Sequence, residues 1–100
     1  MPTKNDYFYI ETEQLLITTY KELVKIIKFY AVDINVYQVE DKIVFSIKNI
    51  INFKDYFKDI CNFAYYNNCT NLTEKEFNKL VSDYDLNNDL INDEYIKGVN

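Results

Sequence analysis

The sequence contains no histidine, no arginine and no tryptophan, and it has one proline and one glycine, Gly98. Without histidine the chain cannot form a Ser-His-Asp or Cys-His nucleophile pair, and it lacks the most common transition-metal ligand. Without arginine it has no planar guanidinium group that could hold a phosphate or a guanine at two points. A single glycine cannot supply a glycine-rich phosphate loop. We therefore expect a protein that is not an enzyme.

Charge and hydropathy exclude further classes of protein. All eleven cations are lysines and there are sixteen acids, which gives a net charge of −5 and a pI of about 4.6. This acidity disfavours direct nucleic-acid binding, and the lysines form no basic face for a membrane surface. No apolar run is long enough to span a bilayer, and the N-terminus lacks the basic-then-apolar order of a signal peptide. These features predict a cytoplasmic protein.

Length and composition predict one small domain over residues 1–100. Hydrophobic residues make up 48% and aromatic residues 17% of the chain, which is enough for a core. The order of apolar patterns predicts an α+β fold: a long N-terminal helix, a small antiparallel hairpin sheet and three C-terminal helices. Residues 7–10, Tyr-Phe-Tyr-Ile, favour β structure and can add a short edge strand.

The first helix and the hairpin have distinct periodicities. Apolar residues recur at steps of three and four between Leu16 and Ala31, which predicts a helix over about residues 12–31. Apolar residues at every second position then begin at Ile34 and again at Ile43, which predicts two antiparallel strands. Glu40-Asp41 lies between them as the expected hairpin tip.

Three helices are predicted to follow the hairpin. The first starts at Asn52 as its cap, and its expected inner face is formed by Phe53, Phe57, Ile60, Cys61 and Ala64. The second starts with a capping box formed by Thr73 and Glu76. A last short helix, about residues 89–97, would bury Leu90, Ile91 and Tyr95.

An acidic stretch near the C-terminus, SDYDLNNDLINDEY at residues 82–95, contains five carboxylates and no lysine. Its spacing approaches that of an EF-hand calcium loop, with carboxylate or amide oxygens at loop positions 1, 3, 5 and 12. The candidate metal ligands are Asp83, Asp85, Asn87 and Glu94. Against calcium, loop position 6 is Asn88 instead of glycine, and position 9 is Ile91, which has no ligand atom.

A purely structural interpretation of the same stretch needs no metal. Asp83 and Asp85 would end one helix and Asp89 would cap the next, while Asn87 and Asn88 form the turn between them.

The third interpretation is a surface for a protein partner. Residues 1–70 carry nine acids and eight lysines, whereas residues 71–100 carry seven acids and three lysines, so a net −4 of the total −5 lies in the last third. Such a field attracts basic partners. The candidate partner-binding residues are Asp83, Tyr84, Asp85, Asp89, Asp93, Glu94 and Tyr95.

The chain also contains ten tyrosines, a residue type enriched at protein interfaces. We expect six of them to be at least partly exposed: Tyr7, Tyr9, Tyr56, Tyr65, Tyr66 and Tyr95. An exposed tyrosine-rich strand at residues 7–10 could pair two copies as a homodimer.

Size, acidity, aromatic content and lack of catalytic residues together resemble a type of protein. The whole chain looks like the small inhibitors that phages and mobile elements use against host machinery, anti-CRISPR proteins among them. Its abundance of Ile, Asn, Lys, Tyr and Phe, which AT-rich codons favour, agrees with such a source. The resemblance implies a protein that blocks a basic, nucleic-acid-handling partner such as a nuclease. An immunity protein against a toxin and a single-loop calcium-binding module are the alternatives, and only the last needs a cofactor.

Overall fold

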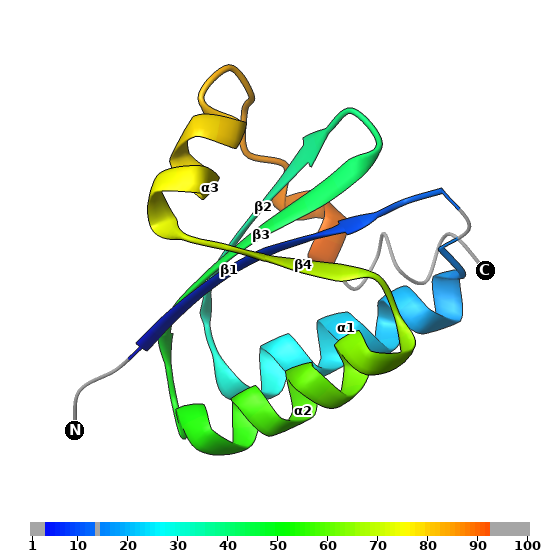
Figure 1. Cartoon of the computed structure of the whole chain (residues 1–100), viewed down its shortest axis with the longest axis vertical. Helices are drawn as coiled ribbons and strands as arrows, with labels where there is room; N and C mark the ends of the chain where they lie inside the picture. Colours follow the sequence, from blue (N-terminus) through cyan, green and yellow to red (C-terminus); the bar gives the residue numbers. More distant parts are fainter. Residues whose placement is uncertain (1–3, 14, 93–100) are drawn as a thin grey trace.

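The computed structural model describes residues 4–13 and 15–92. Its elements in chain order are β1 (Lys4–Glu11), α1 (Ile17–Tyr30), β2 (Asp33–Val39), β3 (Lys42–Ile50), α2 (Phe53–Tyr66), β4 (Cys69–Leu72), α3 (Glu74–Val81) and the 3-10 helix η1 (Asn88–Ile91). The four strands form one antiparallel sheet in the order β2-β3-β1-β4 (Figure 1). The first six elements, β1 to β4 with α1 and α2, therefore follow the split βαββαβ topology of ferredoxin-like folds. The helix α3 is added after them.

The fold predicted from sequence is wrong in its arrangement. No long helix leads the described chain, because the strand β1 precedes α1. β1 lies inside the sheet between β3 and β4, and it is not the short edge strand expected at residues 7–10. Only two α-helices, α2 and α3, follow the hairpin in the described residues, and β4 separates them. The sheet has four strands because β3 pairs with both β1 and β2, and β1 also pairs with β4.

Helices cover the two faces of the sheet unequally. Figure 1 shows α1 and α2 side by side on one face and the shorter α3 on the other. The larger core lies under α1 and α2 and includes Phe8, Phe45 and Tyr56. A smaller core lies under α3 and joins Tyr7, Val39, Val44, Phe77 and Val81. Alternate residues of β1 are thus buried on opposite faces, as expected for a central strand.

The buried face of α2 differs from the one predicted. Tyr56, Ile60 and Phe63 point into the core, while Cys61 is exposed and 53% of Phe57 is exposed. Tyr56 is completely buried, and its hydroxyl donates a 2.6 Å hydrogen bond to Asp6 of β1, which satisfies the only polar group of the ring.

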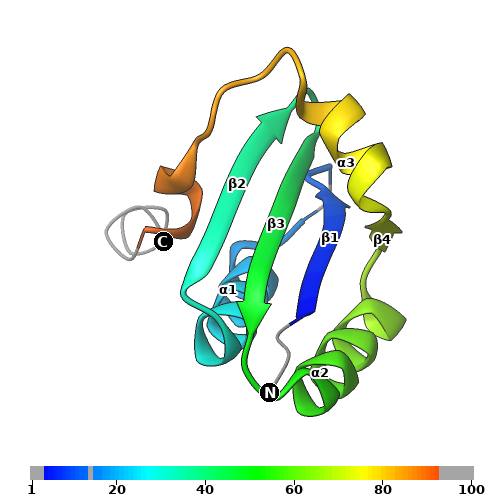
Figure 2. The same cartoon turned by 90° about the vertical axis from the view of Figure 1, so that its left-hand side faces the viewer.

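The segment after α3 crosses to the opposite edge of the sheet. Figure 2 shows it leaving α3, passing the hairpin end of the sheet and reaching the outer edge of β2, where η1 lies. The helix expected at about residues 89–97 is therefore a 3-10 turn as far as Ile91, and residues 93–97 lie outside the described residues. In residues 4–13 and 15–92, no helix has the length and apolar character needed to cross a bilayer.

Candidate functional site

The capping box predicted at the start of α3 is confirmed. Thr73 Oγ1 accepts a hydrogen bond from the Glu76 N–H at 3.1 Å, and Glu76 Oε1 accepts one from the Thr73 N–H at 2.9 Å. The backbone hydrogen bond from Thr73 lowers the pKa of Glu76. Because Thr73 directly follows β4, this box fixes the direction in which α3 leaves the sheet.

The acidic stretch begins where α3 ends. The N–H of Tyr84 donates to the carbonyl of Val81 at 3.0 Å, which turns the chain away from the helix axis. Asp83 and Asp85 flank Tyr84 and are exposed, and the tyrosine itself is 37% exposed. Within the described part of the chain, neither carboxylate has a hydrogen-bond or ion-pair partner. Among the described residues, nothing neutralises these two charges.

The next residues pair with the outer edge of β2. Leu86 forms an antiparallel bridge with Tyr37, and the N–H of Asn87 donates to the carbonyl of Val36 at 2.8 Å. Asn88 Oδ1 accepts from the N–H of Val36 at 2.8 Å. The expected turn between two helices at Asn87 and Asn88 is therefore wrong, since both residues complete hydrogen bonds of a strand edge.

A buried contact holds the end of this segment. Leu90 is only 6% exposed and belongs to the larger core, and its carbonyl accepts a 2.7 Å hydrogen bond from the hydroxyl of Tyr20 on α1. Asp89, between these anchored residues, is exposed on η1. The segment from Ser82 to Leu90 is thus fixed by α3 at one end and by β2 and α1 at the other.

The structure does not gather the predicted partner-binding residues into one cluster. Asp83, Tyr84 and Asp85 lie between the end of α3 and the bridge to Tyr37, whereas Asp89 lies on η1 beside β2 (Figure 2). The remaining three predicted residues, Asp93, Glu94 and Tyr95, are outside the described residues. The described acids, Asp83, Asp85 and Asp89, are therefore spread along the segment.

Nor does the backbone of residues 83–88 form an EF-hand loop. Such a loop turns sharply at its sixth residue, here Asn88. Positive φ angles occur in the described chain only at Glu40, Asn49 and Asn52, and the Asn88 side chain is bonded to β2. Among the described residues, no three His, Cys, Asp or Glu side chains lie close enough together to hold a metal ion. Glu94, the last candidate ligand, lies outside them.

Tyr84 borders a groove that sequence analysis did not indicate. The groove has a volume of about 580 Å³ and lies between α3, β1 and the β2–β3 hairpin, and we call it the α3 groove. Tyr9, Val39, Leu72, Leu80 and Tyr84 supply its apolar and aromatic wall, and Glu40, Lys42, Glu76 and Lys79 supply its charged groups. Tyr9 and Leu72 could have been assigned to this face from the strand alternation, had β4 been recognised.

One ion pair lies at the hairpin end of the α3 groove. Lys42 Nζ is 3.1 Å from Oδ1 of Asp41 and 5.6 Å from the ring centroid of Tyr9. The hydrogen bond between the charged groups lowers the pKa of Asp41 and raises the pKa of Lys42. Much of the Lys42 charge is therefore balanced within the protein.

The tyrosines divide between core and surface differently from the expectation. Tyr65 and Tyr66 are strongly exposed, at 82% and 76%, and their rings contact each other. Tyr7 and Tyr56 are buried, so their predicted exposure is wrong. Since β1 is an interior strand, it offers no free edge for the dimer proposed at residues 7–10.

Comparisons with protein-family models, with curated proteins and with solved structures found no match to this chain.

Proposed function

We propose that this chain is a stoichiometric protein inhibitor that blocks a basic, nucleic-acid-handling protein, in the manner of anti-CRISPR and other phage- or mobile-element-encoded anti-defence inhibitors. The binding surface would comprise α3, residues 82–86 and the tip of the β2–β3 hairpin. The observation that supports this most is the exposure of Asp83 and Asp85, which precede and follow the partly exposed Tyr84 and have no hydrogen-bond or ion-pair partner among residues 4–13 and 15–92.

The charge of this surface supports a basic partner. Its acids are Glu40, Asp41, Glu74, Glu76, Asp83 and Asp85, and its lysines are Lys42, Lys75 and Lys79, which gives −6 and +3, a net of −3. Carboxylates on such a surface attract the basic surface with which a partner binds nucleic-acid phosphates. They would then compete with the phosphates for that basic surface. Association would then be fast at low ionic strength and would weaken as salt screens the charges.

The anchoring of the segment also supports binding. Hydrogen bonds exchanged with the backbone of Val36 and one donated by Tyr20 hold residues 86–90 in place, and the capping box holds α3. A surface that is already ordered loses less conformational entropy when a partner binds. The acids would therefore reach a partner in a fixed arrangement.

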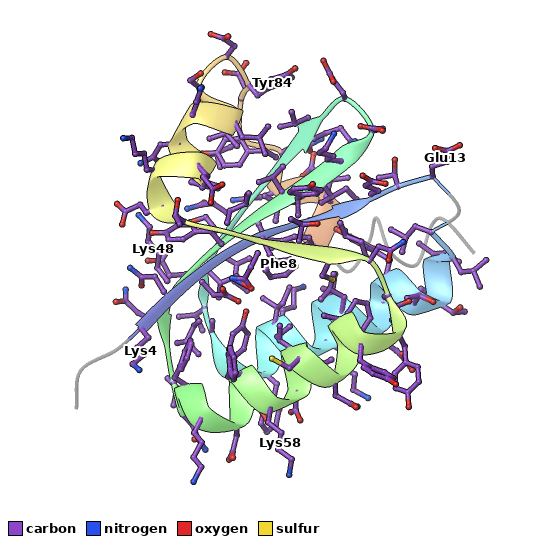
Figure 3. All side chains as sticks on the ribbon, viewed as in Figure 1. Lys4, Phe8, Glu13, Lys48, Lys58 and Tyr84 are labelled. Atoms are coloured by element: carbon purple, nitrogen blue, oxygen red, sulfur yellow. The ribbon has the colours of Figure 1, made fainter. Side chains whose placement is uncertain are left out.

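Parallel affinity capture tests the proposal. Wild-type protein, the variant D83N/D85N and the charge-matched control E13Q/E22Q would each be immobilised and exposed to lysate of a suspected host. Figure 3 shows Glu13 far from Tyr84, and Glu22 lies on α1 across the sheet, so the control changes charge away from the surface. We expect a nucleic-acid-binding partner that wild type and control retain and D83N/D85N loses.

Two further measurements would complete this test. Adding the wild-type protein to the purified partner should abolish nucleic-acid binding at a one-to-one ratio, and the affinity should fall steeply with salt. Equal retention on all three proteins, or a partner without a basic surface, would contradict the proposal.

A further inference from the structure

We infer that the α3 groove takes one bulky apolar side chain of the partner, from a segment in which lysines or arginines flank that side chain. This inference rests on the proposed function, because it names the chemistry that the same surface would recognise. It concerns the groove residues Tyr9, Leu72, Leu80 and Tyr84, none of which is an acid.

The groove exists because α3 is too short to cover its face of the sheet. Phe77 and Val81 occupy the centre of the smaller core, where the ring of Phe77 lies 5.0 Å from that of Tyr7 and 5.7 Å from that of Tyr37. Leu80, Leu72 and Tyr9 lie at the margin of this core and are only partly buried. Apolar surface therefore remains open between α3 and the hairpin.

Its size and shape suit a side chain inserted from outside. The volume of about 580 Å³ lies in the range of a few hundred to about 1,000 Å³ typical of ligand sites in proteins. The groove is open to solvent, so an inserted side chain does not have to enter an enclosed cavity. Such an anchor in a concave apolar site, with a polar rim around it, is the usual organisation of an interface hot spot.

The charges around the groove determine which partner residues can lie beside the inserted apolar side chain. Glu40 and Glu76 stand on the rim, and Asp83 and Asp85 adjoin it through Tyr84. Of the two lysines, Lys42 is already paired with Asp41. The net charge of −3 that remains favours cations on both sides of an inserted apolar group and disfavours an acidic segment.

Tyr84 links the two parts of the surface. Its ring borders the apolar groove, while the residues on either side of it are carboxylates. A partner segment that places an apolar side chain against this ring would therefore bring its neighbouring cations next to Asp83 and Asp85.

Short synthetic peptides test the inference without knowledge of the partner. One peptide has a central phenylalanine between lysine pairs, a second has serine in place of the phenylalanine, and a third has glutamates in place of the lysines. Binding to the ¹⁵N-labelled full chain would be followed by chemical-shift changes. We expect the first peptide to shift the amides of Leu72 and Leu80 and to bind about tenfold more tightly than the second, as burial of a phenylalanine side chain predicts. The third should not bind.

Matched variants locate the contact. Tyr84→Ala should weaken the phenylalanine peptide severalfold, whereas Tyr65→Ala, which removes a far more exposed tyrosine from the end of α2, should leave its affinity unchanged. Equal affinity for the phenylalanine and serine peptides would overturn the groove inference, and so would the absence of shifts at millimolar peptide.

The outcomes separate this inference from the proposed function. If both lysine peptides bind equally and D83N/D85N weakens them equally, the acidic surface is retained and only the groove inference fails. If D83N/D85N still captures the host partner, the proposed function fails, and the groove loses the partner that it was inferred to serve.

Discussion

Asn88 Oδ1 accepts a hydrogen bond of 2.8 Å from the backbone N–H of Val36, in the place where a neighbouring strand would supply a carbonyl. The N–H of Asn87 donates in turn to the carbonyl of Val36 at 2.8 Å. β2 is an edge strand, and an edge with unpaired backbone groups invites pairing with other chains. Two consecutive asparagines therefore protect part of this edge and fix the acidic segment to it.

Replacing Asn88 with alanine should destabilise the protein. The substitution removes the acceptor for the part-buried N–H of Val36, and an unsatisfied group of this kind costs about 1–3 kcal/mol. Urea unfolding would measure the loss. Asn68→Ala, an exposed control, should change the free energy of unfolding by less than about 0.5 kcal/mol. Similar losses in the two variants would show that the contact with Val36 contributes nothing special.

Loss of the Tyr20 hydroxyl should have a comparable effect. Its 2.7 Å hydrogen bond to the carbonyl of Leu90 is buried and joins positions 70 residues apart. We expect Tyr20→Phe to lower the free energy of unfolding by about 1–2 kcal/mol, because the carbonyl of Leu90 is left without that donor. Tyr30→Phe is the matched control, since the hydroxyl of Tyr30 bonds to Asp59 on the surface. Calorimetric melting should show a clearly larger decrease in Tm for Tyr20→Phe.

Asp6 contributes to the free energy of unfolding, and this contribution decreases as the pH rises. Burial raises the pKa of Asp6 above its ordinary value of 3.8, although the hydrogen bond from Tyr56 opposes the shift. The folded chain thus binds this proton more tightly than the unfolded chain. The resulting stabilisation is present below pH 3.8 and is lost as pH rises through the raised pKa. The variant Asp6→Asn lacks this contribution. Its free energy of unfolding minus that of the wild type should therefore increase as the pH rises above 3.8, and then level off.

The hydrogen bond from Tyr56 allows an independent check of the same group. Its hydroxyl lies 2.6 Å from Oδ2 of Asp6 and favours the ionised carboxylate. Tyr56→Phe removes this donor, so the pKa of Asp6 should rise further, and carboxyl ¹³C shifts during a pH titration would report it. A lower pKa of Asp6 in this variant would contradict the assigned role.

The capping box should determine how firmly α3 stays on the sheet. Thr73→Ala removes the hydroxyl that accepts from the N–H of Glu76, and the loss of such a cap costs about 1 kcal/mol. Hydrogen exchange should then accelerate most at the amides of α3, which begins at this cap. Thr70→Ala, an exposed position on β4, should leave exchange in α3 unchanged. Uniform acceleration over the whole chain would instead indicate that α3 unfolds only with the rest of the protein.

The parts of the fold that sequence predicted well depend on strong local signals. Alternation places Ile34 and Val36 inward as expected, Glu40-Asp41 forms the hairpin tip, and Thr73 with Glu76 forms the capping box. Each of these signals involves residues close together in the chain. Local chemistry was sufficient to predict them.

The errors arise where distant contacts decide the structure. Residues 69–72, Cys-Thr-Asn-Leu, have no hydrophobic alternation, and they form β4 because β1 pairs with them. Tyr56 is buried and Phe57 is half exposed, and the buried hydroxyl of Tyr56 finds its hydrogen-bond partner in Asp6, fifty positions away. The α3 groove likewise combines residues from β1, the hairpin, β4 and α3, so no single stretch of sequence indicated it.

Glu40 combines backbone strain with a position on the rim of the α3 groove. Its φ angle is 56°, in the left-handed region that glycine adopts without penalty. We expect Glu40→Gly to raise the free energy of unfolding by about 1 kcal/mol, since a left-handed conformation costs a residue with a Cβ about 1–2 kcal/mol. Asp41→Gly, at the neighbouring turn position without a positive φ, should not stabilise the protein, because glycine there adds freedom to the unfolded chain and removes the ion pair with Lys42.

The same substitution should weaken binding. Glu40→Gly removes one acid from the rim, so the lysine-flanked phenylalanine peptide should lose affinity even as the melting temperature rises. Opposite changes in stability and binding in one variant would indicate that the strained glutamate is kept for recognition. Unchanged peptide affinity in Glu40→Gly would instead mean that this carboxylate contributes nothing to the charge that the partner meets.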